Sequence, residues 1–167
     1  PGIVAGLMLA LGAAVAEEVF LRGFLLRLLN ARFGSTIAVA AVSLAFGLVH
    51  AISPGAGWTG AAAAVVSSGL LLCSSYLLTR RLWLPLGIHF AWNAMQAAVY
   101  GVNLSGSGSG RGYWAGELTG PDWLSGGSMG AEGSVVIIGL GLLAGVGFTI
   151  AAVRSGRWRS LRTARAQ

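Results

Sequence analysis

The sequence predicts an all-α protein: a polytopic bundle of about five transmembrane helices that encloses a polar site. Three observations lead to this prediction. Hydrophobic residues make up 55% of the 167 residues and charged residues only 10%, whereas about a quarter of a soluble domain is charged. The mean hydropathy of +0.75 is correspondingly high. Long apolar stretches recur along the chain, and several contain polar residues at helical spacing.

Five apolar stretches are long enough, or nearly so, to cross a bilayer, because a spanning helix needs about 20 mostly apolar residues. The many Gly, Ala and Ser residues inside them let membrane helices approach closely. The chain has no initiator Met and enters the first stretch at once, without a basic signal-peptide region, so we expect upstream sequence to be missing. The predicted spans are residues 2–29, 36–51, 59–79, 83–100 and 134–153.

The placement of the eleven arginines predicts the orientation. Arg27 and Arg32 follow the first span, Arg80 and Arg81 follow the third, and the tail 154–167 follows the fifth. An alternating path places these three regions on one side, which is the cytoplasmic side because cytoplasmic loops collect basic residues. We interpret the tail as a membrane anchor that gains from anionic lipid, so no nucleic-acid partner is expected.

The predicted organisation has four parts. Residues 1–100 form the core that carries the polar motifs, and residues 101–133 form a flexible Gly/Ser-rich extracytoplasmic loop. Residues 134–153 are the last transmembrane helix, and residues 154–167 are the basic cytoplasmic tail. The single cysteine, Cys73, has no partner in the chain and is predicted to be a packing residue.

The stretch AEEVFLRG, residues 16–23, places three charged side chains inside the first span. Each costs about 2.5–3.5 kcal/mol near the centre of a membrane helix, so each needs compensation. Glu18 and Arg22 are four residues apart and share a helix face, where they can pair. Glu17 is rotated by roughly 100° from Glu18 and has no local partner. We therefore expect the pair to support the site and Glu17 to face a reacting group.

Two later spans contribute further polar groups at the same spacing. Phe46 and His50 share a face in FGLVH, and His89 and Asn93 share a face in HFAWN. Together with Glu17, they supply a carboxylate, two imidazoles and a carboxamide from three helices. Such a set can convert water into a nucleophile and stabilise the resulting oxyanion. The predicted catalytic residues are therefore Glu17, His50, His89 and Asn93.

The motifs EEVFLR, FGLVH and HFAWN resemble the three ordered motifs of the CPBP (Abi) family of intramembrane endopeptidases, over residues 16 to about 96. That family comprises the CAAX prenyl proteases and bacterial proteins of bacteriocin processing and immunity. The resemblance implies a helical bundle that hydrolyses a peptide or membrane-protein substrate. It also implies that Glu17 and His50 activate water, that His89 and Asn93 hold the oxyanion, and that the Glu18–Arg22 pair supports the first helix. Relatives have further spans before the first motif, so we expect this sequence to be part of a longer protein.

Metal dependence is left open by the motifs. Glu17, His50 and His89 could form a zinc site with two histidines, one carboxylate and an open position for water. The pattern H-E-x-x-H is absent, however, and zinc-bound Glu17 would require a second base. We therefore favour a glutamate mechanism without a cofactor, with zinc as the alternative.

Two other functions are compatible with intramembrane Glu and His: a proton-coupled transporter and a non-catalytic bacteriocin-immunity protein. Asn93 favours the protease, because a carboxamide cannot relay a proton at neutral pH but can donate to an oxyanion. The expected location is a bacterial plasma membrane. The expected partners are the substrate and the lipid bilayer, and the oligomeric state is left open.

Overall fold

The computed structural model describes residues 2–106 and 112–160, and within these ranges the regular structure is helical. This confirms the predicted all-α class. Several long helices contain π-helical segments, labelled η1, η2 and η3, and π-helical turns are frequent at functional sites. The elements are α1 (Gly2–Glu17), η1 (Glu18–Leu26), α2 (Arg27–Ala51), α3 (Gly57–Ala64), η2 (Val65–Gly69), α4 (Leu70–Thr79), α5 (Trp83–Ala94), η3 (Met95–Tyr100), α6 (Asp122–Ser125), η4 (Gly127–Met129), η5 (Ala131–Gly133) and α7 (Val135–Arg154).

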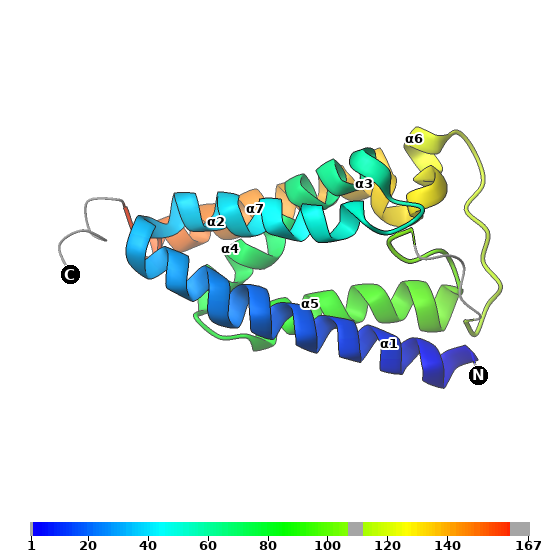
Figure 1. Ribbon diagram of the computed structural model, residues 1–167, viewed down its shortest axis with the longest axis horizontal. Helices are drawn as coiled ribbons and strands as arrows, with labels where there is room; N and C mark the ends of the chain where they lie inside the picture. The colour runs from blue at the N-terminus through cyan, green and yellow to red at the C-terminus, as the bar shows by residue number, and fades with distance from the viewer. Residues whose placement is uncertain (1, 107–111, 161–167) are drawn as a thin grey trace.

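The chain reverses direction inside α2, at Gly34. Its φ of 79° and ψ of 172° are not helical, and a positive φ is adopted most readily by glycine. Figure 1 shows the first limb running from the N-terminus to the opposite end of the bundle and the second limb returning above it. The predicted boundary between the first two spans therefore coincides with this turn.

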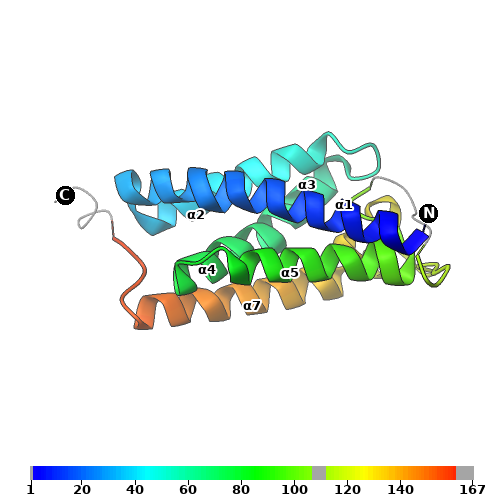
Figure 2. The ribbon, with the colours of Figure 1, turned by 90° about the horizontal axis from the view of Figure 1, so that it is seen from below.

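The helices pack in pairs into an elongated bundle. α1 lies against α5, α2 against α3, and α4 against α7, and Figures 1 and 2 show these pairs running side by side. Small residues permit the close contacts, as predicted. A Cβ atom added to Gly6 of α1 would lie 2.8 Å from the Cα atom of Ala98, so these backbones touch.

Three helical runs among the described residues are long and apolar enough to cross a membrane: Gly2–Ala51, Gly57–Thr79 and Val135–Arg154. The first run contains both limbs of the hairpin at Gly34. The continuous helix formed by α5 and η3 carries His89, Asn93 and Gln96, which lower its hydropathy. The chain is thus an integral membrane protein, and the count of five spans stays a prediction.

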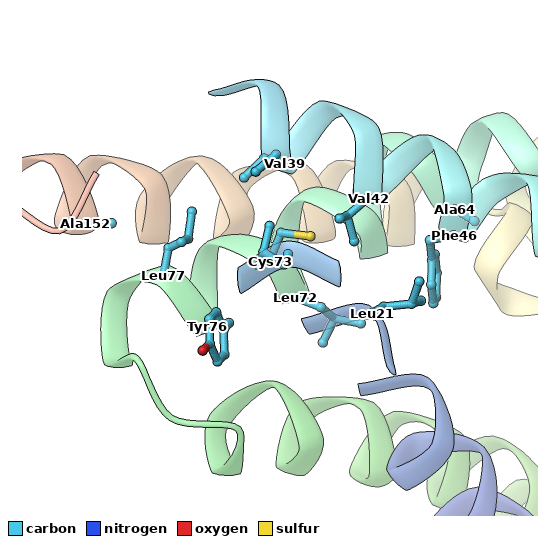
Figure 3. Packing of buried hydrophobic residues seen from close by; sticks show 12 residues of the cluster. Leu21, Val39, Val42, Phe46, Ala64, Leu72, Cys73, Tyr76, Leu77 and Ala152 are labelled. Atoms are coloured by element: carbon cyan, nitrogen blue, oxygen red, sulfur yellow. The ribbon is translucent and has the colours of Figure 1, made fainter. Parts of the chain in front are cut away.

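An apolar core joins η1, the second limb of α2 and α4 (Figure 3). Phe46, Leu72 and Leu77 are almost completely buried in it. Cys73 is fully buried in the same cluster and is a free thiol, which confirms its predicted packing role. The core fixes η1, and therefore the polar motif on η1, against the other helices.

The segment between η3 and α7 is tied to the bundle where it is described. Tyr113 and Trp114 donate backbone N–H groups to the carbonyls of Ala98 and Val99, both at 2.8 Å. Ser128 Oγ donates to the carbonyl of Gly55 at 2.7 Å. The flexibility predicted for residues 101–133 stays a prediction.

Candidate active site

The motif residues converge from three parts of the bundle. Glu17 ends α1, Glu18 and Arg22 lie on η1, His50 lies near the end of α2, and His89 and Asn93 lie on α5. Glu18 and Arg22 have no exposed surface, and His89 and Asn93 are nearly as buried. The partly exposed members are Glu17 and His50.

Glu18 and Arg22 form the ion pair expected from their spacing. Nη1 of Arg22 donates to Oε1 of Glu18 at 2.8 Å, and both side chains are fully buried. Removing either partner would leave an uncompensated charge in the interior, which proteins rarely tolerate. The pair therefore compensates two of the three charges in the first span.

Glu18 has a second partner that the motif spacing does not indicate. Nδ1 of His89 lies 2.8 Å from Oε1 of Glu18. A carboxylate accepts, so Nδ1 carries the hydrogen, and Nε2 of a neutral His89 is then an acceptor. Glu18 thus positions the imidazole and selects its tautomer, as a carboxylate does for a histidine in many catalytic sites. Because 71 positions separate the two residues, only a knowledge of the helix packing would reveal the contact.

Glu17 approaches the other nitrogen of the same imidazole. Its Oε2 lies 3.9 Å from Nε2 of His89, and among the described residues this buried oxygen has no hydrogen-bond partner. The separation is too long for a direct hydrogen bond. The carboxylate without a local partner therefore faces the imidazole that Glu18 positions.

The ring of Phe46 connects the three polar helices. The guanidinium of Arg22 lies 4.8 Å from the ring centroid, a favourable cation–π distance. The His50 ring lies 4.4 Å away and the His89 ring 6.2 Å away, centroid to centroid. Nδ1 of His50 donates to the carbonyl of Phe46 at 2.8 Å, so Nε2 is the nitrogen that can act on a substrate.

A cavity of about 470 Å³ adjoins these groups. Three of the predicted site residues line it: His50, His89 and Asn93. Its walls are otherwise mainly apolar, and α7 contributes Ile137 and Leu140. Glu17 is not among the residues that line it, and its Oε2 lies 3.9 Å from Nε2 of His89, which does line it. Ligand sites commonly combine apolar walls with a few convergent polar groups.

Glu132 also lines the cavity, and the sequence analysis missed it. Its Oε1 accepts from Nε1 of Trp92 at 2.9 Å and from Nε2 of Gln96 at 3.0 Å. Its Oε2 accepts from Oγ of Ser105 at 2.6 Å. Glu132 follows a Gly/Ser-rich stretch, where an acidic residue is expected to be solvated, so no local signal marked it. Glu132 and Asn93 line the same cavity.

The residues proposed as alternative zinc ligands do not gather around one point. No group of three His, Cys, Asp or Glu side chains suited to a metal ion occurs within residues 2–106 and 112–160. His89 directs its two nitrogens at Glu18 and Glu17, whereas the ring of His50 packs on Phe46. The set Glu17, His50 and His89 thus does not fit a metal in this arrangement.

The fold defines a class: a helical integral membrane protein. The particular family follows from a comparison with family models. The model described as "Type II CAAX prenyl endopeptidase Rce1-like" matches residues 1–95, and the chain belongs to this family. This confirms the resemblance indicated by the motifs. No curated protein matches the chain. No solved structure matches it either.

Proposed function

We propose that the chain is an intramembrane endopeptidase in which Glu17 activates a water molecule to hydrolyse a peptide bond. The observation that supports this most directly is the buried Oε2 of Glu17. It faces Nε2 of His89 at 3.9 Å, and His89 is itself held by Glu18 at 2.8 Å. A water molecule that enters between this base and the positioned imidazole would be the nucleophile.

In the proposed mechanism, the water oxygen attacks the carbonyl carbon of the substrate while Glu17 accepts a proton. With Nδ1 held by Glu18, Nε2 of a neutral His89 accepts a hydrogen bond from the same water. In this proposal His89 therefore orients the water and does not hold the oxyanion, which differs from the role that the family resemblance implies. The carboxamide of Asn93 donates to the oxyanion that develops on the carbonyl. Nε2 of His50, on the cavity wall, assists Glu17 in activating the water. The proton taken up by Glu17 passes to the leaving amine when the C–N bond breaks.

The apolar cavity walls support a substrate with an apolar segment at the bond that is cleaved. A volume of about 470 Å³ accommodates several side chains, within the range of small-molecule pockets. The name of the family suggests a prenylated C-terminal peptide, and we propose this as one substrate class beside unmodified membrane peptides. Paired peptides with and without a prenyl group on the same cysteine distinguish the two.

The function is tested with protein purified in detergent and a peptide library analysed by mass spectrometry. We expect Glu17→Gln to reduce the cleavage rate by about 10²–10⁴-fold, because it removes the general base. Glu117→Gln is the matched control: it makes the same chemical change on an exposed side chain of the outer segment and should leave the rate unchanged. Equal cleavage by the parent and Glu17→Gln would eliminate the mechanism.

The same assay tests the catalytic type. A glutamate mechanism predicts that cleavage persists after treatment with a chelator. Loss of cleavage with the chelator and its recovery on adding zinc would instead show a metalloprotease that rearranges Glu17, His50 and His89 around the ion.

A further inference from the structure

Four side chains around Glu132 meet where α5 becomes η3, and the proposed mechanism does not use them. Oε1 of Glu132 accepts from Nε1 of Trp92 at 2.9 Å and from Nε2 of Gln96 at 3.0 Å. Oε2 accepts from Oγ of Ser105 at 2.6 Å. Gln96 is buried and the other three residues are partly buried. We call these four residues the Glu132 cluster.

One carboxylate oxygen in this cluster joins two kinds of helix. Trp92 belongs to α5, and Gln96 belongs to η3, which begins at Met95. An α-helix has 3.6 residues per turn, whereas a π-helix pairs each N–H group with a carbonyl five residues earlier. A shift of the junction by one residue would therefore rotate the side chains beside it. Because both donors bind the same Oε1, Glu132 holds the junction in one position.

Asn93 lies at this junction, one residue after Trp92 and three residues before Gln96. The residue is only 5% exposed, and it lines the cavity together with Trp92 and Glu132. A rotation of the helix at this point would turn its carboxamide away from the cavity. The direction of the carboxamide thus depends on the contacts on both sides of it.

The backbone that carries Glu132 is itself fixed. Figure 1 shows the segment between η3 and α7 at the end of the bundle that holds the N-terminus. Gly106 N–H donates to the carbonyl of Met129 at 3.1 Å. Gly130 has a φ of 84°, and a Cβ atom added to it would lie 2.2 Å from the carbonyl oxygen of Asn103, so these backbones touch. Glu132 therefore projects from a closely packed turn and can hold a helix in place.

We propose that Glu132 is a positioning residue that acts through Trp92 and Gln96. It holds the junction of α5 and η3 so that the carboxamide of Asn93 faces the cavity, and it does not itself contact the reacting atoms. This inference rests on the proposed function, in which Asn93 donates to the oxyanion. The two are tested by different measurements.

Gln96→Met isolates the positioning role. The change removes a donor to Oε1 of Glu132 but leaves the cavity wall intact, because Gln96 is not among the residues that line it. For a peptide that the parent cleaves, we expect kcat to fall about tenfold while KM changes less than about twofold, since misplacing a group that acts only on the transition state lowers kcat alone. A raised KM with an unchanged kcat would contradict the proposal.

The dependence on Asn93 is tested with a double variant. Asn93→Ala alone should lower kcat by about 10²–10³-fold, as the loss of an oxyanion donor does. If Gln96 acts through Asn93, adding Gln96→Met to Asn93→Ala should lower kcat by less than a further factor of about two. A further fall as large as that in the parent would show that Gln96 acts independently of Asn93 and would overturn the proposal.

Trp92→Phe removes the other donor to Oε1 and covers the case in which Gln96→Met does not fold, as judged by thermal unfolding. We expect a fall in kcat of about tenfold here as well. Trp83→Phe is the matched control, because Trp83 lies on the same helix but is 78% exposed, and its kcat should equal that of the parent. Equal kcat values in Trp92→Phe and Trp83→Phe would be evidence against the positioning role.

Nuclear magnetic resonance gives a measurement that does not depend on proteolysis. The chain has three asparagines, Asn30, Asn93 and Asn103, so labelling with ¹⁵N-asparagine gives three carboxamide signals, and Asn93→Ala identifies the signal of Asn93. We expect Gln96→Met to move this signal and to leave that of Asn30 on α2 in place. An unmoved Asn93 signal would overturn the positioning role even if the parent cleaves peptides. A parent that cleaves no peptide would overturn the proposed function, and a moved signal would then still support the hold of Glu132 on the junction.

Discussion

Two carboxylates, Glu18 and Glu132, contact residues that line the cavity of the candidate active site, and they are held in different ways. Glu18 is fully buried, and its partners are the guanidinium of Arg22 and the imidazole of His89, each at 2.8 Å. Glu132 is partly buried and accepts from three neutral side-chain donors, at 2.6–3.0 Å. Among the described residues, the first carboxylate has charged partners and the second has neutral hydrogen-bond donors.

The difference separates two tasks within one bundle. Glu18 holds a side chain of the helical bundle in place, because it binds Nδ1 of His89 while Nε2 of the same ring faces Glu17. Glu132 instead connects η5 in the outer segment to α5 and η3 through Trp92 and Gln96. Glu18 thus supports the proposed chemistry, and Glu132 fixes the wall of the cavity.

The largest effect is expected from breaking the charged cluster. Arg22→Met should destabilise the protein by about 3–5 kcal/mol, because it leaves the Glu18 carboxylate buried without its cation. The measurement is the free energy of unfolding in mixed detergent and denaturant. Arg32→Met, which changes an exposed arginine, is the control and should have little effect.

A double variant distinguishes compensation from packing in this cluster. Adding Glu18→Leu to Arg22→Met should recover part of the lost stability, because both buried charges are then absent. A double variant that is less stable than Arg22→Met alone would show that the contact of Glu18 with His89 matters more to folding than the ion pair.

A smaller effect is expected at Glu132. Glu132→Gln keeps the size of the side chain but replaces one accepting oxygen with a donor, so at least one of three donors loses its acceptor. We expect the free energy of unfolding to fall by about 1–3 kcal/mol. Glu117→Gln on an exposed side chain should not change it. A loss as large as that of Arg22→Met would remove the distinction between the two carboxylates.

The membrane bundle and the Glu18–Arg22 pair were predictable because both follow from local rules. Apolar length predicts a spanning helix, and a spacing of four places two side chains on one helix face. The same rules assigned His50, His89 and Asn93 to helix faces that border one cavity. Each of these predictions depends only on residues within one segment.

Contacts between segments were not predictable from one sequence. His89 reaches Glu18 because α1 packs on α5, and Glu132 reaches Trp92 across 40 positions. The loop around Glu132 was predicted to be flexible from its Gly and Ser content, which indicates backbone freedom but not which side chains the loop contacts.

The smallest effect is expected from a single donor to Glu132. Trp92→Phe keeps most of the ring but removes the N–H that donates to Oε1 at 2.9 Å, so we expect a loss of about 1 kcal/mol. Trp83→Phe, on the same helix but 78% exposed, is the control. The double variant Trp92→Phe with Glu132→Gln should lose about 0.5–1 kcal/mol less free energy of unfolding than the sum of the two single losses, because both changes remove the same hydrogen bond. Strict additivity would mean that this hydrogen bond does not stabilise the protein, and the connection of the outer segment to α5 would then depend on Gln96 and Ser105.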